Sequence, residues 1–481
     1  MKEDLVKIKL FNTLTRKKEV LTPIKPGEVN FYSCGQTVYE DVHVGNAKTY
    51  IVWDVLVRTL KHFNYGVKHI QNFTDVGHLT DDEDSGEDKI VKRAKELQED
   101  PMELVDRKIY EYYRDMDKIN IARPSIAPRA TGHVIEMIDL VQTLLDKEHA
   151  YESNGSVYYD ISTFQEYGKL AKLDLSNLKA GARIEVIEGK RNPGDFALWI
   201  KAPKAHIMKY TSPWSIGYPG WHLECSSMVM KYFGNTVDIH AGGIDHIPVH
   251  HTNEIAQSEG ATGEKFANIW LHSAFITING EKMSKSKSNF VTLEKFIDEV
   301  GPGTVRMTFA QLHYRTQGDF SHKQASSTKK RYNRLIRNYH FALQFLVEKE
   351  VDLDFNTIDE KSNLMDKFNK ALADDLNTPL AIAQINTISN RLDQARKAED
   401  SSSVKLHLRE FEIMMDVLGI PFTKLSKEEV IHVNDLLSIR KSLKEEDKME
   451  DSDKIRNHLQ KQQYTIQDQQ DGTFNWYKSD L

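Results

Sequence analysis

The chain has 481 residues, of which 40% are hydrophobic and 28% charged, and its formal net charge is −7. This length exceeds a single hydrophobic core, so we expect roughly two to four domains. The sequence has no run of about 18 apolar residues, and its charged start, "MKEDLVKIKL", lacks the apolar core of a signal peptide. We therefore expect a cytoplasmic protein with no membrane contact, and its acidic balance argues against non-specific coating of nucleic acid.

The first part of the chain predicts a parallel sheet covered by helices. "VNFYSCG" (29–35) and "GVKHIQNFTDV" (66–76) have strand character, and "NAKTYIVWDVLVRTLKHFNY" (46–65) between them has apolar residues at helical spacing. Two more helices are expected over residues 87–98 and 102–118. The succession of strand, helix and strand is typical of an α/β fold.

Residues 120–205 are rich in Gly, Asn and Pro, and we interpret them as an insertion. Strand signals return in "TVDIHAGGID" (236–245) and "ANIWLHSAFITI" (267–278). Beyond residue 320 the segments are charged and helical, which predicts a helical bundle, with "DSSSV" (400–404) as a loop between helices. A short charged module follows Pro421, and "DGTFNWYKSDL" predicts a small strand-containing tail.

Two stretches of the sequence are strongly charged. The acidic stretch "TDDEDSGEDK" (80–89) lacks the spacing of a calcium-binding loop, so we expect a solvated turn. The basic stretch 322–338 predicts a helix whose cations either face solvent or bind phosphate. Its six cations are Lys323, Lys329, Lys330, Arg331, Arg334 and Arg337.

The chain has two cysteines, Cys34 and Cys225, and a cytosolic protein rarely joins such a pair as a structural disulfide. Metal binding, catalysis or inert burial therefore remain for them. In "VHHTNEIAQSEG" (249–260), His250 and Glu254 would share one face of a helix. Two thiolates, an imidazole and a carboxylate suit zinc. Neighbouring residues leave alternative ligand sets open: His240, Asp245, His246 and His251.

Two further motifs suit phosphate chemistry. "TVYEDVHVGNAK" (37–48) places His43 and Asn46 where a strand leads into a helix, whose first N–H groups would be free, and Gly45 lets a ligand approach the backbone. "NGEKMSKSKSNF" (279–290) carries Lys282 and Lys285 in a loop, where two ammonium groups can neutralise charge on phosphates during transfer at the α-phosphorus. An ordinary basic surface loop would contain the same residue types.

The pair "HVGN" and "KMSKS" resembles the HIGH and KMSKS signatures of class I aminoacyl-tRNA synthetases. From about residue 7 to residue 320 the chain resembles the cysteinyl-tRNA synthetase family, and residues 368–385, "FNKALADDLNTPLAIAQI", are similar to that family's tRNA-binding bundle. The segments that carry the resemblance include "CGQTVYEDVHVGN", "NFTDVGHLTDDEDSGEDK", "PRATGHVIEMIDLV", "SPWSIGYPGWHLECS", "DIHAGGIDHIPVHHTNEIAQSE" and "HSAFITINGEKMSKS".

The resemblance implies an α/β fold with a Rossmann-like parallel-sheet catalytic domain, an insertion, an α-helical bundle and a small C-terminal module. The implied domains are the two catalytic halves 1–119 and 206–320, the connective insertion 120–205, the tRNA-binding bundle 321–420 and the anticodon-side module 421–481. The implied activity is that of a cysteine–tRNA ligase, which activates L-cysteine with ATP and Mg²⁺, releases pyrophosphate and transfers cysteine to the 3′ end of tRNA-Cys. A monomer with one Zn²⁺ per chain is expected.

The resemblance also implies roles for individual residues. The implied zinc ligands are Cys34, Cys225, His250 and Glu254, and Trp221 would lie near the amino acid. It also implies that Lys285 contacts ATP and that His43 and Asn46 lie at the nucleotide phosphates. Together with the two phosphate motifs above, this predicts ATP binding by Thr37, His43, Gly45, Asn46 and Lys285, and catalysis by His43, Asn46, Lys282 and Lys285. The chain departs from the family pattern at Asn46, where the signature ends in histidine, and at Thr252, Lys287 and Ser288.

Zinc suits this substrate because a pocket that measures size alone gains only about 1 to 3 kcal/mol per small group, whereas ten-thousandfold selectivity needs about 5.5 kcal/mol. A metal that prefers a thiolate to a hydroxyl rejects serine at the first step. Two alternatives remain: a related ligase that joins cysteine to an amino sugar, and a non-catalytic paralogue that binds nucleic acid. Relatives of the first kind are shorter and lack the complete C-terminal half.

Overall fold

The computed structural model describes residues 5–80, 86–173, 189–203, 206–278, 280–282, 290–355, 358, 360–469 and 474–479. At its centre is a four-stranded parallel sheet of order β11-β10-β3-β4. Its strands and connecting helices are β3 (Glu28–Thr37), α1 (Val44–His62), β4 (Gly66–Thr74), β10 (Val237–Gly243), α7 (His250–Thr262) and β11 (Ala267–Ser273). This confirms the predicted Rossmann-like sheet, and the order reverses between β3 and β10, where α/β sheets open a crevice for ligands.

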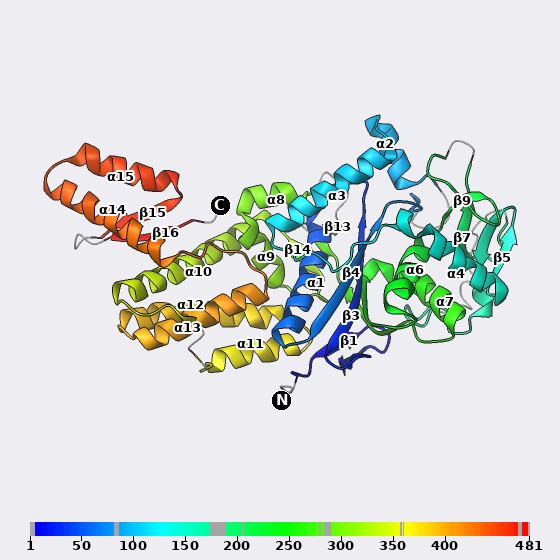
Figure 1. Cartoon of the computed structure of the whole chain (residues 1–481), viewed down its shortest axis with the longest axis horizontal. Helices are drawn as coiled ribbons and strands as arrows, with labels where there is room; N and C mark the ends of the chain where they lie inside the picture. The colour runs from blue at the N-terminus through cyan, green and yellow to red at the C-terminus, as the bar shows by residue number, and fades with distance from the viewer. Residues whose placement is uncertain are drawn as a thin grey trace.

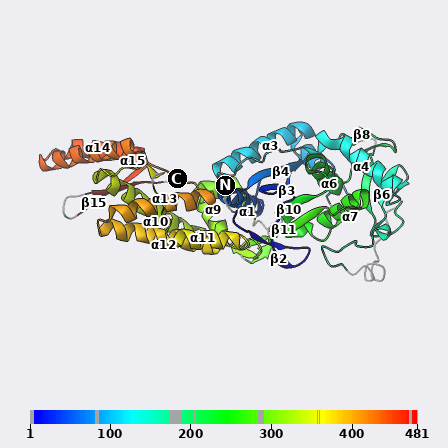
Figure 2. The ribbon, with the colours of Figure 1, turned by 60° about the horizontal axis from the view of Figure 1, so that its bottom comes forward.

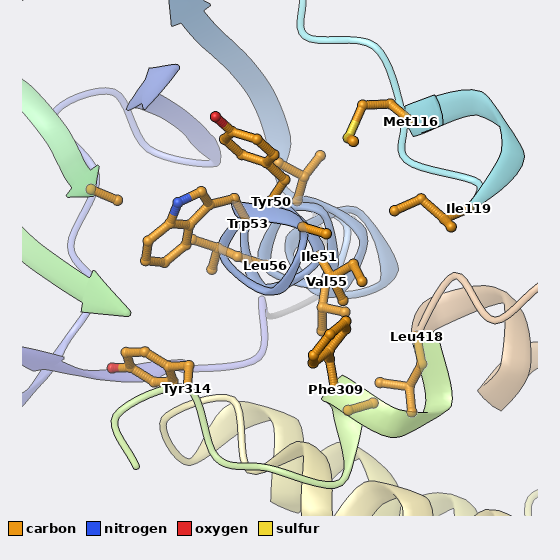
Figure 3. Packing of buried hydrophobic residues seen from close by; sticks show 14 of the residues in the cluster. Tyr50, Ile51, Trp53, Val55, Leu56, Met116, Ile119, Phe309, Tyr314 and Leu418 are labelled. Carbon is orange, nitrogen blue, oxygen red and sulfur yellow. The ribbon is translucent and has the colours of Figure 1, made fainter. Parts of the chain in front are cut away.

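The helix α1 lies in the core because apolar side chains surround it. Figure 3 shows Tyr50, Ile51, Trp53, Val55 and Leu56 packed against side chains that come from other elements. Those other residues are Met116, Ile119, Phe309, Tyr314 and Leu418. These contacts pack α1 against α3 (Pro101–Lys118) and α9 (Pro302–Ala310). They also reach Leu418, which follows α13 (Ser401–Val417). The first and last parts of the chain therefore share one core.

The segment between the two halves of the sheet forms an antiparallel sheet of order β5-β6-β7-β9-β8. Its strands are β5 (Ala150–Ser153), β6 (Ser156–Tyr159), β7 (Phe196–Lys201), β8 (Tyr210–Thr211) and β9 (Ile216–Pro219). It follows η1 (Ala130–His133) and α4 (Val134–Asp146), contains η2 (Ile161–Thr163), and leads from β9 directly into α6 (Trp221–Phe233). Figure 1 shows this sheet on the side of the molecule opposite the helical half.

Smaller elements surround the central sheet. They are β1 (Lys9–Asn12), β2 (Lys17–Val20), α2 (Lys89–Leu97), η3 (Ile244–His246), β12 (Ile276–Ile278), β13 (Glu281–Lys282), α8 (Leu293–Val300) and β14 (Gly318–Phe320). The three strands β13, β12 and β14 form a separate small sheet in that order.

The C-terminal part confirms the predicted bundle and tail. It consists of α10 (His322–Glu348), α11 (Asn363–Ala373), α12 (Thr378–Lys397), α13, the hairpin of α14 (Lys427–Glu445) and α15 (Met449–Lys461), and the strands β15 (Tyr464–Asp468) and β16 (Phe474–Lys478). Figures 1 and 2 show α14 and α15 at the far end of an elongated molecule. Within the described ranges, no helix is long and apolar enough to cross a membrane.

One predicted loop is wrong. The serines of "DSSSV" form the first turn of α13, which begins at Ser401, and the side chain of Asp400 caps it by accepting a hydrogen bond from the Ser403 N–H at 3.1 Å. An acidic N-cap followed by small residues is a common start of a helix.

A buried ion pair joins α1, beside the central sheet, to the helical half. Arg306 on α9 donates to Asp54 Oδ2 of α1 at 2.6 Å and to the carbonyl oxygen of Leu418 at 2.7 Å. Both side chains are inaccessible to solvent, at 0% and 1% exposure. Burial alone would raise the pKa of Asp54, but Arg306 and Arg58 lower it below its usual value.

Removing one partner of this pair leaves the other charge buried without compensation. We expect Asp54→Ala to destabilise the fold by about 3 to 5 kcal/mol, seen as a lower midpoint of urea unfolding followed by tryptophan fluorescence. The matched control is Asp374→Ala, which breaks the exposed Lys18–Asp374 pair of 2.8 Å and should cost about 1 kcal/mol or less. Equal effects of the two substitutions would contradict the role given to Asp54.

Candidate active site

Two adjoining cavities open where β3 and β10 end. The first has a volume of about 390 Å³ and the second about 560 Å³. The residues that line both are Cys34, Gly35, His43, Asn46, Asp245 and His246. Their position at the reversal of strand order is the usual ligand site of an open α/β sheet.

The structure brings together all four residues that were expected to bind a metal. Cys34 comes from β3, Cys225 from α6, and His250 and Glu254 from the first turns of α7. One donor atom from each lies within 4.8 Å of the others. The two sulfur atoms are 3.9 Å apart, and His250 Nε2 lies 3.0 Å from Glu254 Oε1.

This geometry fits a tetrahedral ion. Two sulfur ligands at the usual zinc distance of about 2.3 Å would be separated by about 3.8 Å, close to the observed spacing. Glu254 Oε1 is buried and has no well-formed hydrogen bond among the described residues, and its close contact is the ion pair with His250 Nε2. A buried carboxylate oxygen without a donor is costly unless a cation binds it.

Two neighbouring histidines orient these groups. His222 Nδ1 lies 2.9 Å from His250 Nδ1, which leaves His250 Nε2 to face the cluster. His240 Nε2 lies 2.6 Å from Glu254 Oε2. Partners of this kind commonly fix the orientation of metal ligands. Residue type and spacing do not mark His222, because only the packing of α6 against α7 brings it to His250.

A second set of donors lies deeper in the protein. Cys34 and Glu254 also cluster with His240 and His251, and His251 Nε2 lies 3.2 Å from Cys34 Sγ. Cys34, Cys225 and His250 line the first cavity, whereas His240 and His251 do not. An ion in the first set would therefore face the space where a substrate can enter.

The ionisation of the cluster favours a cation. Burial and the neighbouring Cys225 raise the pKa of Cys34 well above its usual value. Burial would also raise the pKa of Cys225, but hydrogen bonds with Cys34 and His250 lower it to about 6. Burial would raise the pKa of Glu254 as well, yet His240 and His250 lower it to about 2. A thiolate and a carboxylate are thus favoured at neutral pH. Burial would lower the pKa of His250, but Glu254 and Cys225 raise it to about 10, so a metal ion would take the place of the His250 proton.

His43 caps the start of α1 and faces both cavities. Its Nδ1 accepts hydrogen bonds from the Gly45 N–H at 3.1 Å and the Asn46 N–H at 3.2 Å. The expectation that these N–H groups are free for a phosphate is therefore wrong, because the His43 side chain already binds them. With Nδ1 accepting, Nε2 carries the proton of the neutral ring and can donate it to a ligand.

The other predicted site residues are distributed as follows. Trp221 lines the first cavity, with its ring stacked on His250 at a centroid distance of 4.3 Å. Thr37 lines the same cavity, and Gly45 lines the second. The backbone of Lys282 pairs with Thr277 in the small sheet. The side chain of Lys282 lies outside the described part, as do Lys285, Lys287, Ser288 and residues 81–85 of the acidic stretch.

Comparisons with known proteins show which family the chain resembles over nearly its whole length. A family model described as "tRNA synthetases class I (C) catalytic domain" matches residues 20–330, and a "DALR domain" matches residues 367–423. The chain is 42% identical to a cysteine--tRNA ligase of Chlorobaculum tepidum, with 98% of each chain covered. It is 40% identical to a cysteine--tRNA ligase of Thermus thermophilus, with 96% of this chain and 98% of the relative covered.

Solved structures share the fold at low identity. The methionyl-tRNA synthetase of Mycobacterium tuberculosis in complex with methionyl-adenylate gives a TM-score of 0.57 at 16% identity, over 81% of this chain and 89% of that one. A LeuRS of Agrobacterium radiobacter gives 0.58 at 12% identity, over 85% and 88%. The near-complete coverage of relatives about 40% identical, together with the two domain matches, shows that the chain belongs to the cysteine--tRNA ligase family of class I aminoacyl-tRNA synthetases.

Proposed function

We propose that the chain activates L-cysteine with ATP and transfers it to tRNA-Cys, and that Cys34, Cys225, His250 and Glu254 hold one Zn²⁺ that selects the substrate. The observation that carries this proposal is the four-donor cluster at the wall of the first cavity. Zinc at these side chains would supply a soft Lewis acid that favours a deprotonated thiol over a hydroxyl or a methyl group.

The two cavities suit the two small substrates. In the first cavity, the thiol of the cysteine substrate would point toward the four-donor cluster, and Trp221 would form a wall of the cavity. The second cavity is lined by Gly45, Asn46 and Phe275, of which Phe275 is 45% exposed, and suits the nucleotide. His43 and Asn46 line both cavities, so they lie where the carboxylate of cysteine would meet the α-phosphate.

The chemistry needs positioning and charge stabilisation more than a covalent enzyme intermediate. The cysteine carboxylate attacks the α-phosphorus in line and pyrophosphate leaves. The neutral Nε2–H of His43 and the amide of Asn46 would donate to the phosphate oxygens. Lys285, to which the resemblance assigns contact with ATP, and Lys282 would neutralise the remaining negative charge, which Mg²⁺ bound to ATP would share. The adenylate then passes its acyl group to the terminal ribose of tRNA.

The C-terminal half distinguishes this activity from that of an amino-sugar ligase. The relatives match nearly the full chain, and the DALR match at residues 367–423 lies within α11, α12 and α13 and the residues that follow them. This supports a tRNA, and not an amino sugar, as the acceptor of the cysteinyl group. The complete cluster also argues against a paralogue without catalytic activity.

The activation step can be tested by ATP–pyrophosphate exchange. We expect exchange that depends on L-cysteine, that L-serine does not support, and that disappears when a chelator removes the metal and returns when Zn²⁺ is added. Purified enzyme should also charge one tRNA species with labelled cysteine, which an amino-sugar ligase would not do. Equal exchange with serine would contradict the proposed selection.

The protonation of His43 provides a second test. Burial lowers the pKa of His43 to about 4, although nearby Asp245 favours the charged ring. Between pH 6.5 and 4 the unfolded chain gains a proton here that the folded chain does not bind, so stability falls as the pH falls through this window. From pH 6.5 to 5 we expect the wild type to lose about 1 to 2 kcal/mol more than His43→Asn.

Urea unfolding of both proteins at the two pH values measures this difference, since asparagine can still cap α1 but does not titrate. If the two proteins lose stability in parallel, His43 is not held neutral in the fold.

A further inference from the structure

The segment between β4 and α2 reaches into the first cavity and places His78 in its wall. Its backbone is fixed at several points. The Lys89 N–H donates to the carbonyl oxygen of His78 at 2.9 Å, and the Gly77 N–H donates to Asp88 Oδ2 at 2.8 Å. Gly77 has a φ of 79°, and a Cβ there would lie 2.4 Å from the carbonyl oxygen of Pro219. Only glycine permits this contact, which presses the segment against the start of α6.

Two hydrogen bonds fix the orientation of the His78 ring. Its Nε2 lies 2.8 Å from Lys89 Nζ, and its Nδ1 lies 2.8 Å from Thr37 Oγ1. A lysine ammonium can only donate, so Nε2 accepts and Nδ1 carries the proton that it donates to Thr37. The ring is 7% exposed. It therefore has little freedom to turn.

The fixed ring supports Trp221. His78 and Trp221 stack with their centroids 4.0 Å apart and their planes 10° from parallel. The Trp221 ring also stacks on His250, at 4.3 Å and 24°. His78 is thus the outer ring of a row that ends at a residue of the four-donor cluster. Ring contacts of this type contribute about 0.5 to 1.5 kcal/mol beyond the area that they bury.

We propose that His78 is a positioning residue that limits how long a thiol side chain the first cavity accepts. It holds Trp221 against His250 and thereby fixes the wall of this cavity beside the four-donor cluster. This inference rests on the proposed activation of cysteine. It extends that proposal, because zinc at the four-donor cluster would distinguish a thiol from a hydroxyl but would not distinguish side chains of different length. L-homocysteine carries the same thiol on a side chain one methylene longer, so its exclusion needs a wall that does not move.

The consequence of losing the ring follows from its packing. Without the His78 side chain, the outer face of Trp221 has no stacked partner, so the indole can move outward and the pocket can lengthen. Pockets discriminate one methylene by about 10-fold to 200-fold when their walls are rigid. A mobile wall should lose a large part of that factor.

The test compares L-cysteine with L-homocysteine in ATP–pyrophosphate exchange. In His78→Ala we expect the ratio of kcat/KM for cysteine to that for homocysteine to fall by about tenfold, with a higher KM for cysteine and a smaller change in kcat. His78→Asn, which can still bind Thr37 but has no ring, should behave in the same way. His78→Phe keeps a ring against Trp221 and should keep the ratio within about threefold of the wild type.

A matched control is His149→Ala. His149 also has Nδ1 2.8 Å from a threonine hydroxyl, that of Thr163, and its ring is also parallel to an aromatic ring, that of Tyr159, but it lies outside both cavities. This variant should leave the ratio unchanged. Zinc content should be the same in all the variants, which separates a movement of the wall from a loss of metal.

Two results would overturn the proposal: an unchanged ratio in the folded ringless variants, or an equal fall in His149→Ala. If His78→Ala does not fold, the comparison of His78→Asn with His78→Phe decides the question. Failure of the proposed function would look different, because the wild type itself would then show no exchange with cysteine.

Discussion

The site depends on the contact between β3 and β10, the two parallel strands between which the strand order of the sheet reverses. Phe31, Tyr32 and Ser33 pair with residues 239–241 across this contact. The pairing sets the end of β3 beside the helices that follow β9 and β10, so Cys34 meets Cys225, which is 191 positions away in the chain. The fold that buries α1 thus also assembles the donor cluster.

Burial then determines the chemistry of the cluster. Charged groups removed from water must be compensated, and here the compensation is mutual: Glu254 remains ionised because His240 and His250 face it, and Cys225 because Cys34 and His250 bind its sulfur. One carboxylate oxygen remains without a hydrogen bond among the described residues. A divalent cation would satisfy this oxygen and both sulfur atoms, whereas a further protein hydrogen bond would satisfy only one of them.

Periodicity and residue type predicted the elements that hold the site. The buried run around Phe31 predicted β3, and the apolar spacing of residues 46–65 predicted α1. The four donors could be grouped because their types suit one metal and the family motifs surround them. Local composition misled at Ser401, where small polar residues start a helix, and at Gly45, whose N–H binds His43. His222 and His78 lie in segments that carry the family resemblance, but no spacing or residue type singled them out, because their contacts with His250 and Trp221 arise only when distant segments pack together.

The proposed zinc site consists of four side chains, Cys34, Cys225, His250 and Glu254. Zinc bound there should take the substrate thiol as a further ligand. X-ray absorption at the zinc edge, with and without substrate, tests it most directly. We expect two sulfur atoms at about 2.3 Å from zinc in the free enzyme, three after L-cysteine is added, and two after L-serine is added. No bound zinc, or the same number of sulfur ligands with and without L-cysteine, would contradict it.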